Sequence, residues 1–290
     1  IQLSLQQTYF NKQLVLIGGG HANVQVLRKL CMNEYRGLNV ILISEGYEAI
    51  YSGMTPGYIK KVYSLDDISI DLQRLCYNAG ATFIKDKVIN LDNKNQIIHL
   101  NENPSITFDL LSINSGSISN NQSIKFDEKS IVISVKPINS FILKLKTIDD
   151  HIEKSSNRKI SIIGGGVAAF ELSFAIYKRY NENISLSIIS DQLLTEKNLN
   201  QSSINTLKKI ARNLNINLIS KKAITICNSE IILEDGEKIQ SELVLLSTGS
   251  ALPEWLAGSS LEINENFIAV NHHLQSLNFK NIFISGDIAS

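Results

Sequence analysis

The stretch QLVLIGGGHAN, residues Gln13–Asn23, sets three consecutive glycines directly after an apolar run of strand length. Residues 24–30 then carry apolar side chains at mostly helical spacing, so the stretch predicts a strand, a tight turn and a helix. The same order recurs in KISIIGGGVAA, residues Lys159–Ala169, 146 residues later when counted from Gly18 to Gly164. In a chain of 290 residues, this repeat predicts two domains of similar architecture.

Each glycine cluster is followed, after the length of one crossover helix, by a second apolar run, at 38–44 and at 184–190. Strand, helix and strand together form a βαβ unit with parallel strands. Shorter alternating runs predict antiparallel strands beside each parallel core, at 88–91, 96–100, 106–113, 216–219, 223–227 and 230–233. We therefore expect an α/β fold with two Rossmann-like dinucleotide-binding domains, each combining a parallel sheet with a three-stranded antiparallel segment.

Local signals place three further features. Asp66 and Asp67 are predicted to cap a helix that ends at Gly80. A second helix is predicted over residues 139–154, and Asp235-Gly236 is a strong hairpin turn signal.

The chain is electrically balanced. It has 28 Lys and Arg against 28 Asp and Glu, so no net field favours nucleic acid as a partner. No run approaches the roughly 18 apolar residues of a spanning helix, and the N-terminus lacks the pattern of a secretory signal. Cys31, Cys76 and Cys227 are 45 and 151 residues apart, which excludes C-x-x-C redox and zinc patterns. We expect no metal site, buried apolar roles for the cysteines and a cytoplasmic location.

The glycine clusters are close to the G-x-G-x-x-G pattern of dinucleotide-binding turns. The first glycine permits the tight turn, the second lets the backbone approach a pyrophosphate, and the helix N-terminus offers free N–H groups to the phosphates. Gly18 and Gly20 meet the first two requirements, but the third position is Asn23. In the second copy Gly164 and Gly166 match, with Ala169 at the third position. The alternative is a glycine-rich turn that binds no nucleotide. Two glycine clusters in matching strand-to-helix positions argue against this alternative.

An acidic residue that binds a ribose should lie at the end of the second strand of each unit. Glu45 fits this position in the first copy. Asp191 is the candidate in the second copy, although Ser190 can occupy the usual acidic position instead. The alternative for both carboxylates is a solvated turn residue. No arginine closely follows Ser190, which favours NADH over NADPH.

Further segments resemble the pyridine nucleotide-disulfide oxidoreductase superfamily of flavoproteins over nearly the whole chain. FDLLSINSGS, residues 108–117, and ELVLLSTG, residues 242–249, are similar to the two family strands that end in Ala-Thr-Gly. NIFISGD, residues 281–287, is similar to the strand whose Gly-Asp closes over the flavin. The resemblance implies FAD as prosthetic group and NAD(P)H as the second nucleotide. It implies FAD contacts at Val88, Ser115, Gly116, Gly286 and Asp287, whose carboxylate would accept a ribityl hydrogen bond, and an NAD(P)H contact at Gly249.

The same resemblance bears on the chemistry. Glu171 corresponds to the family glutamate that approaches the nicotinamide carboxamide, with a helix-surface carboxylate as the alternative. The segment YSGMTPG, residues 51–57, has no cysteine where the disulfide reductases carry C-x4-C. A dithiol relay is thus excluded, and electrons would leave the flavin directly for an acceptor, as in type II NADH dehydrogenases and quinone reductases. Gly53, Pro56 and Gly57 would place backbone against the flavin ring.

The strings GGGHA and YSGMxPG more closely resemble a subfamily often fused N-terminal to selenophosphate synthetase. This resemblance adds His21 and Ala22 to the expected FAD site. A neutral His21 at the helix N-terminus would donate to the pyrophosphate, and a packed or solvated histidine is the alternative.

These observations predict a discontinuous FAD domain, residues 1–117 and 248–290, with an NAD(P)H domain over 118–247 inserted into it. We expect a longer native polypeptide, because the family's C-terminal interface region, which supplies acceptor contacts and a dimer or peripheral membrane surface, is absent here. The expected function is an FAD-dependent NAD(P)H oxidoreductase acting on a non-disulfide acceptor such as a quinone. A non-catalytic or regulatory nucleotide-binding module that serves a partner, such as selenophosphate synthetase, is the alternative.

Overall fold

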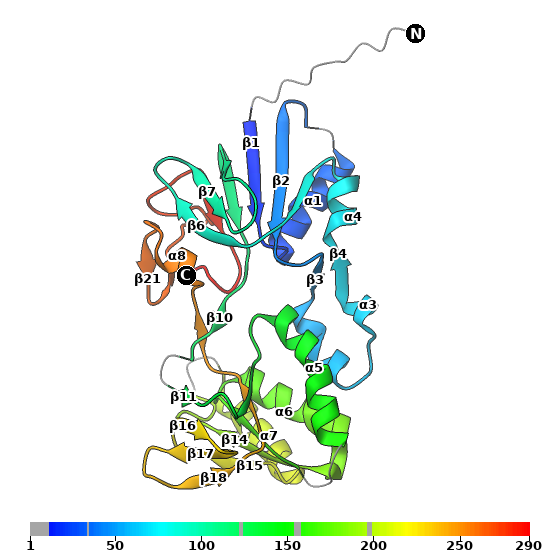
Figure 1. Ribbon diagram of the computed structural model, residues 1–290, viewed down its shortest axis with the longest axis vertical. Coiled ribbons are helices and arrows are strands. Elements are labelled where there is room, and N and C mark those ends of the chain that lie inside the picture. Colours follow the sequence, from blue (N-terminus) through cyan, green and yellow to red (C-terminus); the bar gives the residue numbers. More distant parts are fainter. Residues whose placement is uncertain (1–11, 34, 122–123, 154–157, 196–198) are drawn as a thin grey trace. The chain divides into compact units, whose positions relative to one another are not determined.

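The computed structural model describes residues 12–33, 35–121, 124–153, 158–195 and 199–290. The chain divides into two compact units, which are treated separately (Figure 1). Unit 1 contains the described residues of 12–51, 69–117 and 251–290. Unit 2 contains residues 52–68 and 118–250. The segment 52–68, which the sequence places in the first domain, therefore packs with unit 2.

The centre of unit 1 is a five-stranded parallel sheet in the order β23-β9-β1-β2-β5. The first glycine cluster directly follows its middle strand. In register, Ile17 at the end of β1 pairs with both Ile43 on β2 and Ile113 on β9, and Ile113 also pairs with Ile284 on β23. The strands are β1 (Lys12–Ile17), β2 (Leu38–Ser44), β5 (Thr82–Lys85), β9 (Leu110–Ile113) and β23 (Ile282–Ile284).

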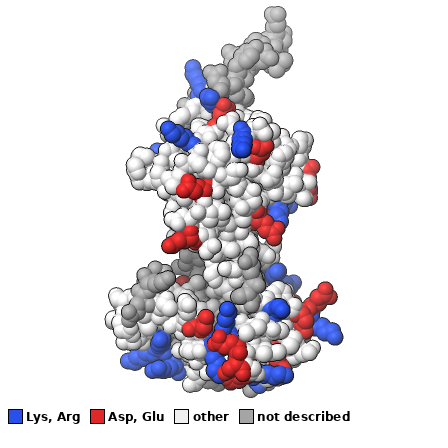
Figure 2. All heavy atoms as spheres, turned by 90° about the vertical axis from the view of Figure 1, so that its left-hand side faces the viewer, with Lys and Arg blue, Asp and Glu red and all other residues white. Residues whose placement is uncertain are grey.

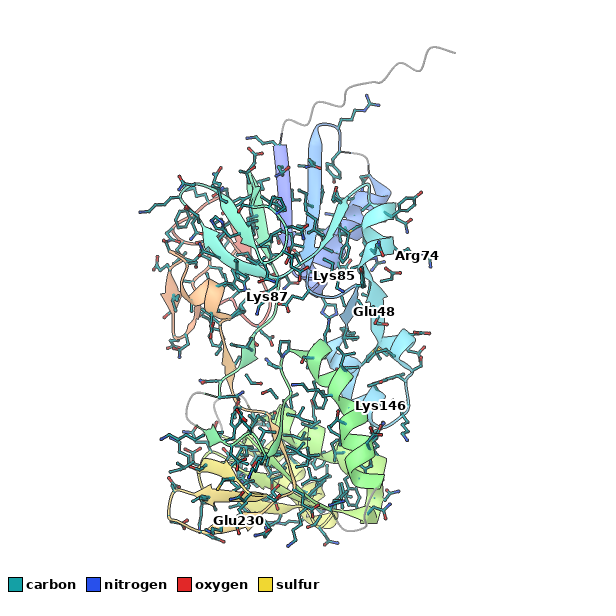
Figure 3. The ribbon with its side chains drawn as sticks, in the orientation of Figure 1. Glu48, Arg74, Lys85, Lys87, Lys146 and Glu230 are labelled. Carbon is teal, nitrogen blue, oxygen red and sulfur yellow. The ribbon has the colours of Figure 1, made fainter. Side chains whose placement is uncertain are left out.

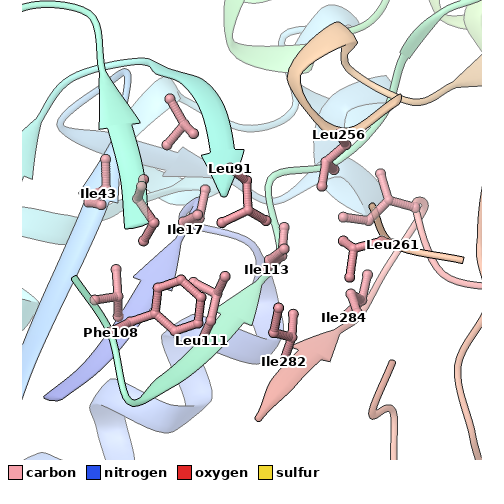
Figure 4. Packing of buried hydrophobic residues seen from close by; sticks show 14 of the residues in the cluster. Ile17, Ile43, Leu91, Phe108, Leu111, Ile113, Leu256, Leu261, Ile282 and Ile284 are labelled. Atoms are coloured by element: carbon pink, nitrogen blue, oxygen red, sulfur yellow. The ribbon is translucent and has the colours of Figure 1, made fainter. Parts of the chain in front are cut away.

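This sheet is buried on both faces, which explains why its strands read as continuous apolar runs. Val15 and Ile17 pack into one buried cluster with Phe108 and Leu111 (Figure 4). Leu16 belongs to a second cluster on the opposite face, where the helices α1 (His21–Met32) and α4 (Leu72–Asn78) pack. The first cluster is covered by the antiparallel strands β6 (Val88–Asp92), β7 (Ile97–Leu100) and β8 (Ile106–Thr107) and by α8 (Glu254–Ala257). Unit 1 also holds β3 (Glu48–Ile50) paired with β4 (Ser69–Asp71), and β21 (Ile263–Asn264) paired with β22 (Phe267–Ile268).

Unit 2 repeats the design with a parallel sheet in the order β12-β19-β13-β14-β15. Its strands are β12 (Ile131–Ser134), β13 (Arg158–Ile163), β14 (Ile184–Ile189), β15 (Asn217–Ile219) and β19 (Leu243–Leu246). A second sheet in the order β11-β16-β17-β18 packs on it through apolar side chains; its strands are β11 (Lys125–Phe126), β16 (Ala223–Cys227), β17 (Glu230–Leu233) and β18 (Lys238–Gln240). The helices are α2 (Thr55–Ile59), α3 (Leu65–Ile68), α5 (Ile138–Glu153), α6 (Val167–Tyr180) and α7 (Gln201–Asn213), with short 3-10 turns at Ser52–Met54 and Asn181–Asn183. The strands β10 (Ile118–Ser119) and β20 (Ser250–Ala251) pair with each other. They lie where the sequence passes from one unit to the other, at 117/118 and at 250/251.

The fold class follows the expectation, and three local predictions are wrong. The run 216–219 is not an antiparallel strand, because it forms β15, which pairs in parallel with β14 at the edge of the main sheet of unit 2. The run 106–113 is not one antiparallel strand, because it splits into β8 of the antiparallel segment and β9 of the parallel sheet. Asp109 marks the break, where its carboxylate accepts a hydrogen bond from the Gln13 N–H at 2.7 Å. The helix predicted to end at Gly80 is α4, which ends at Asn78 and is capped by Asp71, whose side chain accepts from the Arg74 N–H at 2.9 Å, rather than by Asp66 or Asp67.

None of the helices in the described parts of the chain has both the length and the apolar character needed to cross a membrane.

Candidate functional site

In unit 1, the loops that follow four parallel strands meet at the carboxyl edge of the sheet, where ligands of open α/β sheets bind. They are the glycine turn after β1, Glu45 after β2, Asn114 to Gly116 after β9, and Ser285 to Asp287 after β23. Parallel register aligns them, since Gly18 N–H donates to the Ile43 carbonyl (2.8 Å). The topology thus brings together predicted site residues that are up to 269 positions apart, from Gly18 to Asp287.

The glycine turn is crowded where it passes the loop after β9. Gly18 has φ +87°, and a Cβ there would lie 2.5 Å from the Asn114 carbonyl oxygen. A Cβ on Gly20 would lie 2.1 Å from Asn114 Oδ1. Glycine is therefore required at both positions by the space left beside Asn114, and at Gly18 also by the backbone conformation.

Asn114 connects three loops of this edge and was not singled out from the sequence. Its Oδ1 accepts from the Ala22 N–H (3.0 Å), and its Nδ2 donates to the Ser285 carbonyl (2.8 Å). Its own carbonyl accepts from the Gly20 N–H (3.1 Å). Asn114 is 6% exposed, so these bonds are made away from solvent. The only sequence signal was a polar residue directly after a buried parallel strand.

Asn23 stands at the third position of the glycine pattern, and the structure explains this departure. Its side chain is fully buried. The amide Nδ2 donates to the carbonyls of Ile17 (3.1 Å) and Gly18 (2.9 Å), and Oδ1 accepts from the Ser112 hydroxyl (2.7 Å). A hydrogen-bonded amide thus joins helix α1 to β1 and β9, where a glycine would allow direct packing.

The N-terminus of α1 fits an anionic group. The N-cap is Gly20, which makes no side-chain cap, and the first turn holds no acidic residue. The 12-residue helix thus directs its dipole and unpaired N–H groups at the edge of the sheet. Ser285, on the neighbouring loop, has a buried hydroxyl without a hydrogen-bond partner. These features suit a bound pyrophosphate, which would supply the missing acceptors.

The remaining predicted residues of unit 1 lie around this edge. Glu45 is exposed directly after β2. Lys85 ends the neighbouring β5 (Figure 3). Its ammonium lies 4.6 Å from the centroid of the Tyr47 ring. The exposed His21 packs edge-on against Tyr51, with ring centroids 4.6 Å apart, so it is a partly packed histidine.

Asp287 is exposed after β23, and the Ser117 hydroxyl donates to its carboxylate at 3.4 Å. Gly116 and Gly286 both have positive φ, at +73° and +79°. Space remains beside Gly116, where a Cβ would meet nothing within 4 Å, whereas Gly286 is held against Asn114. Ser115, between Asn114 and Gly116, is exposed.

Val88 begins β6, and its side chain is buried in the core, so only its backbone is available to a ligand. The preceding loop is fixed by Asp86, a buried carboxylate. Burial opposes its ionisation, but hydrogen bonds from Asn103, Lys87 and Glu102 outweigh burial and hold the pKa of Asp86 at about 2.

In unit 2, the second glycine cluster lies at the equivalent edge. Gly164 has φ +140°, and a Cβ there would be 2.1 Å from the Ser247 carbonyl oxygen. A Cβ on Gly165 would be 2.0 Å from the Gln192 carbonyl oxygen, a contact that sequence reasoning did not anticipate. In contrast, a Cβ on Gly166 would meet nothing within 4 Å. Gly166 is the N-cap of α6, without a side-chain cap or an acidic first turn. The cluster therefore combines a crowded turn with an open, uncapped helix start.

The other predicted residues of unit 2 surround this turn. Ala169 is fully buried at the third position of the pattern. Glu171 is exposed on α6, and Asp191 is exposed two residues after β14. Ser190, the alternative to Asp191 for the ribose-binding position, accepts a hydrogen bond from the Gln192 N–H (3.1 Å). Gly249 lies in the loop after β19, and a Cβ on it would meet no atom within 4 Å.

Gly53 and Pro56 belong to unit 2 and lie in the segment that contains α2. Arg179 fixes this segment, since its Nη1 donates to the Ile59 carbonyl at the end of α2 (2.7 Å). The same guanidinium forms a two-bond ion pair with Asp149 on α5 (2.8 and 2.6 Å). Burial favours the neutral acid, but the bonds from Arg179 and Tyr180 outweigh it and lower the pKa of Asp149.

Within the described ranges, no group of three or more His, Cys, Asp or Glu side chains is placed to hold a metal ion. On the face drawn in Figure 2, Lys and Arg are interspersed with Asp and Glu, in keeping with the zero net charge.

Comparisons with known proteins agree with this geometry. Residues 12–290 match the family described as pyridine nucleotide-disulphide oxidoreductase. The NADH-rubredoxin oxidoreductase of Clostridium acetobutylicum is 28% identical over 279 residues, which cover 96% of this chain and 68% of that protein. The structure of NDH2 from Plasmodium falciparum in complex with NADH superposes with a TM-score of 0.80 at 17% identity, covering 96% of this chain and 64% of that one. CoADR-RHD of Bacillus anthracis gives a TM-score of 0.81 at 19% identity, with 96% of this chain covered. The chain spans 51% of the length of that protein.

Proposed function

The chain belongs to the pyridine nucleotide-disulphide oxidoreductase family, and from this membership and the two glycine edges we propose that it is an FAD-dependent NAD(P)H oxidoreductase with a non-disulfide acceptor. The observation that carries the proposal is a feature found once in each unit. A helix without a side-chain cap begins directly after a turn in which the available space requires glycine, at the carboxyl edge of a parallel sheet. One such edge suits one dinucleotide, and the oxidoreductases of this family use two, FAD and NAD(P)H.

Unit 1 is proposed to hold FAD. Gly18 and Gly20 let the backbone approach the pyrophosphate, and the N-terminus of α1 stabilises its charge. In this proposal Glu45 would accept from the adenosine ribose, Val88 would meet the adenine through its backbone, and Asp287 would accept from the ribityl chain. Of the remaining candidates, His21 and Ala22 begin α1, and Ser115, Gly116 and Gly286 belong to the two neighbouring loops.

Unit 2 is proposed to hold NAD(P)H at the turn of Gly164 and Gly166. Glu171 would accept from the nicotinamide carboxamide, and Asp191 from the adenosine ribose, with Gly249 leaving room after β19. FAD held by unit 1 would supply the redox chemistry that links oxidation of the nicotinamide to reduction of the acceptor. The protein's part is to orient the two nucleotides and to exclude water, so no side-chain acid or base is required.

The acceptor is proposed to be a small molecule such as a quinone. Support comes from the segment 51–57, which has no cysteine and therefore offers no dithiol relay. A closer relation to the flavoproteins fused to selenophosphate synthetase stays a proposal. A homodimer and a peripheral membrane contact are also proposals.

The test is anaerobic reduction of the FAD-loaded protein by NADH and by NADPH, followed by reoxidation with a quinone, oxygen or a disulfide. We expect the visible flavin band to bleach with at least one nicotinamide, and to recover faster with the quinone than with the disulfide. Flavin that binds but is reduced by neither nicotinamide would refute the enzyme and favour the non-catalytic module.

A matched pair of variants tests the FAD site separately. Gly20→Ala should lose FAD, because its Cβ would meet Asn114 at 2.1 Å. Gly258→Ala is the control, since its Cβ would make an ordinary contact at 3.5 Å and the residue has negative φ. Equal FAD binding by both variants would contradict the proposed site.

A further inference from the structure

Two of the three cysteines, far apart in the sequence, belong to two helices of unit 1 that contact each other, Cys31 to α1 and Cys76 to α4. Figure 1 shows the two helices next to each other. Cys76 is buried in a cluster that also contains Val24 and Leu27 of α1. Cys31 follows Leu27 by four positions and Val24 by seven, and residues with this spacing share one side of a helix. Cys31 is therefore on the side of α1 that faces α4.

The contacts place Cys31 beside the other cysteine. Cys31 Sγ lies 3.9 Å from the carbonyl oxygen of Leu75, the residue before Cys76. Cys31 is exposed, whereas Cys76 is 0% exposed. Burial, and then the neighbouring Cys31 thiol, raise the pKa of Cys76 to about 12. One thiol is thus open to reagents in solution, and its neighbour is shielded and protonated at neutral pH.

We propose that Cys31 and Cys76 form an intramolecular disulfide when a low-molecular-weight disulfide oxidises the protein. This modification site is separate from the proposed electron path. Cys31 lies ten residues beyond His21 on α1, which is about 15 Å along the helix axis from the glycine turn.

The reaction has two exchange steps. The Cys31 thiolate attacks one sulfur of the reagent, a mixed disulfide forms, and one reagent thiolate leaves. The Cys76 thiolate then attacks the Cys31 sulfur, the protein disulfide forms, and the second reagent thiolate leaves. The two protein thiols lose two protons and two electrons in total, and the reagent is reduced to two thiols.

The two steps should have different rates. Cys31 is accessible, so the mixed disulfide forms first. The second step needs ionised Cys76, and the ionised fraction of a thiol with a pKa near 12 rises about tenfold for each pH unit between 7 and 9. Closure should therefore be slow at neutral pH and accelerate with pH by the same factor.

The experiment uses the full chain loaded with FAD and oxidised glutathione as the probe, with acid quenching and intact-mass measurement at pH 7, 8 and 9. We expect one glutathione adduct, mapped to Cys31, which converts to a species lacking two hydrogen atoms. Peptide mapping should find Cys31 joined to Cys76, and dithiothreitol should reverse the change. Closure should be about tenfold faster per pH unit.

Three variants make the result decisive. Cys76→Ala, which keeps a small apolar side chain in the core, should stop at the adduct, and Cys31→Ser should form neither product. Cys227→Ser removes the cysteine of unit 2 and should behave like the unmodified protein. An adduct with the same lifetime in the unmodified protein and in Cys76→Ala would overturn the proposal. Cross-linking of Cys31 between two chains in place of closure would also overturn it.

Discussion

Replacing Asn23 by glycine would restore the glycine pattern, and the structure predicts that it destabilises the protein. The Asn23 side chain makes three hydrogen bonds of 2.7, 2.9 and 3.1 Å, and a longer one of 3.5 Å from Nδ2 to the Ser112 carbonyl, in a fully buried position. At about 1 kcal/mol net for each bond, the loss is about 3 kcal/mol. The lower helix propensity of glycine relative to asparagine increases this destabilisation by only about 0.3 kcal/mol. We expect Asn23→Gly to lower the free energy of unfolding by roughly 2–4 kcal/mol.

Asn23→Ala separates the two contributions. It loses the same bonds but keeps a good helix former, so it should be about 1 kcal/mol more stable than Asn23→Gly. Ser112→Ala removes one partner and should cost about 1 kcal/mol, with a coupling to Asn23→Ala of about 0.5–1.5 kcal/mol in a double-mutant cycle. Urea unfolding and FAD titration measure these effects. A more stable Asn23→Gly, or one that binds FAD more tightly, would refute the reasoning and show that the site prefers direct packing.

Three other perturbations follow from the same contacts. Arg179→Met should lower the free energy of unfolding by about 2–3 kcal/mol, because it removes the cation that compensates the Asp149 carboxylate and leaves it the neutral Tyr180 hydroxyl (2.6 Å), and adding Asp149→Leu should recover most of this loss in urea titrations. Asp86, whose pKa lies below the ordinary 3.8, should contribute stability above pH 4 that is lost as the pH falls towards 2, and Asp86→Asn should remove this part of the acid dependence of unfolding. Gly165→Ala should abolish NAD(P)H binding by distorting the turn, whereas Gly166→Ala should fold normally and weaken binding only if the nucleotide occupies its open side; isothermal titration with both variants decides this.

The fold was predictable because its signals are local. The apolar runs before Gly18 and Gly164 and the helical spacing after them are visible within windows of a few residues, and parallel βαβ connectivity leaves few topologies. Asp109 shows where local signals fail. Its run of alternating residues reads as one strand, but a tertiary hydrogen bond to the Gln13 N–H divides it between two sheets. The residues around Asp109 do not indicate that its hydrogen-bond partner is Gln13, which lies 96 residues away in the sequence.

The candidate site was predictable where a residue's role is set by its own backbone, as at Gly18 and Gly164, both of which have positive φ. It was not predictable where the role comes from partners distant in sequence. Asn114 is an example, since its amide is useful only because the glycine turn and the Ser285 loop are brought to it by the sheet. Arg179 is another, because its bond to the Ile59 carbonyl joins segments 120 residues apart.

Asn23 and Asn114 together show how an edge of this kind can be held in shape by the protein's own groups. A glycine turn leaves backbone carbonyls and N–H groups unpaired next to a helix N-terminus, and buried unpaired groups are costly. Asn23 satisfies the carbonyl of Gly18 from inside the core, and Asn114 satisfies the N–H of Ala22 from the neighbouring loop. Asn114 takes the N–H of Ala22, and neither amide bonds to the N–H groups of His21 and Asn23 in the same first turn of α1. Because the two amides hold the glycine turn in its conformation, a bound pyrophosphate would meet N–H donors at the start of α1 that are already positioned. Its binding would then need to order little additional structure.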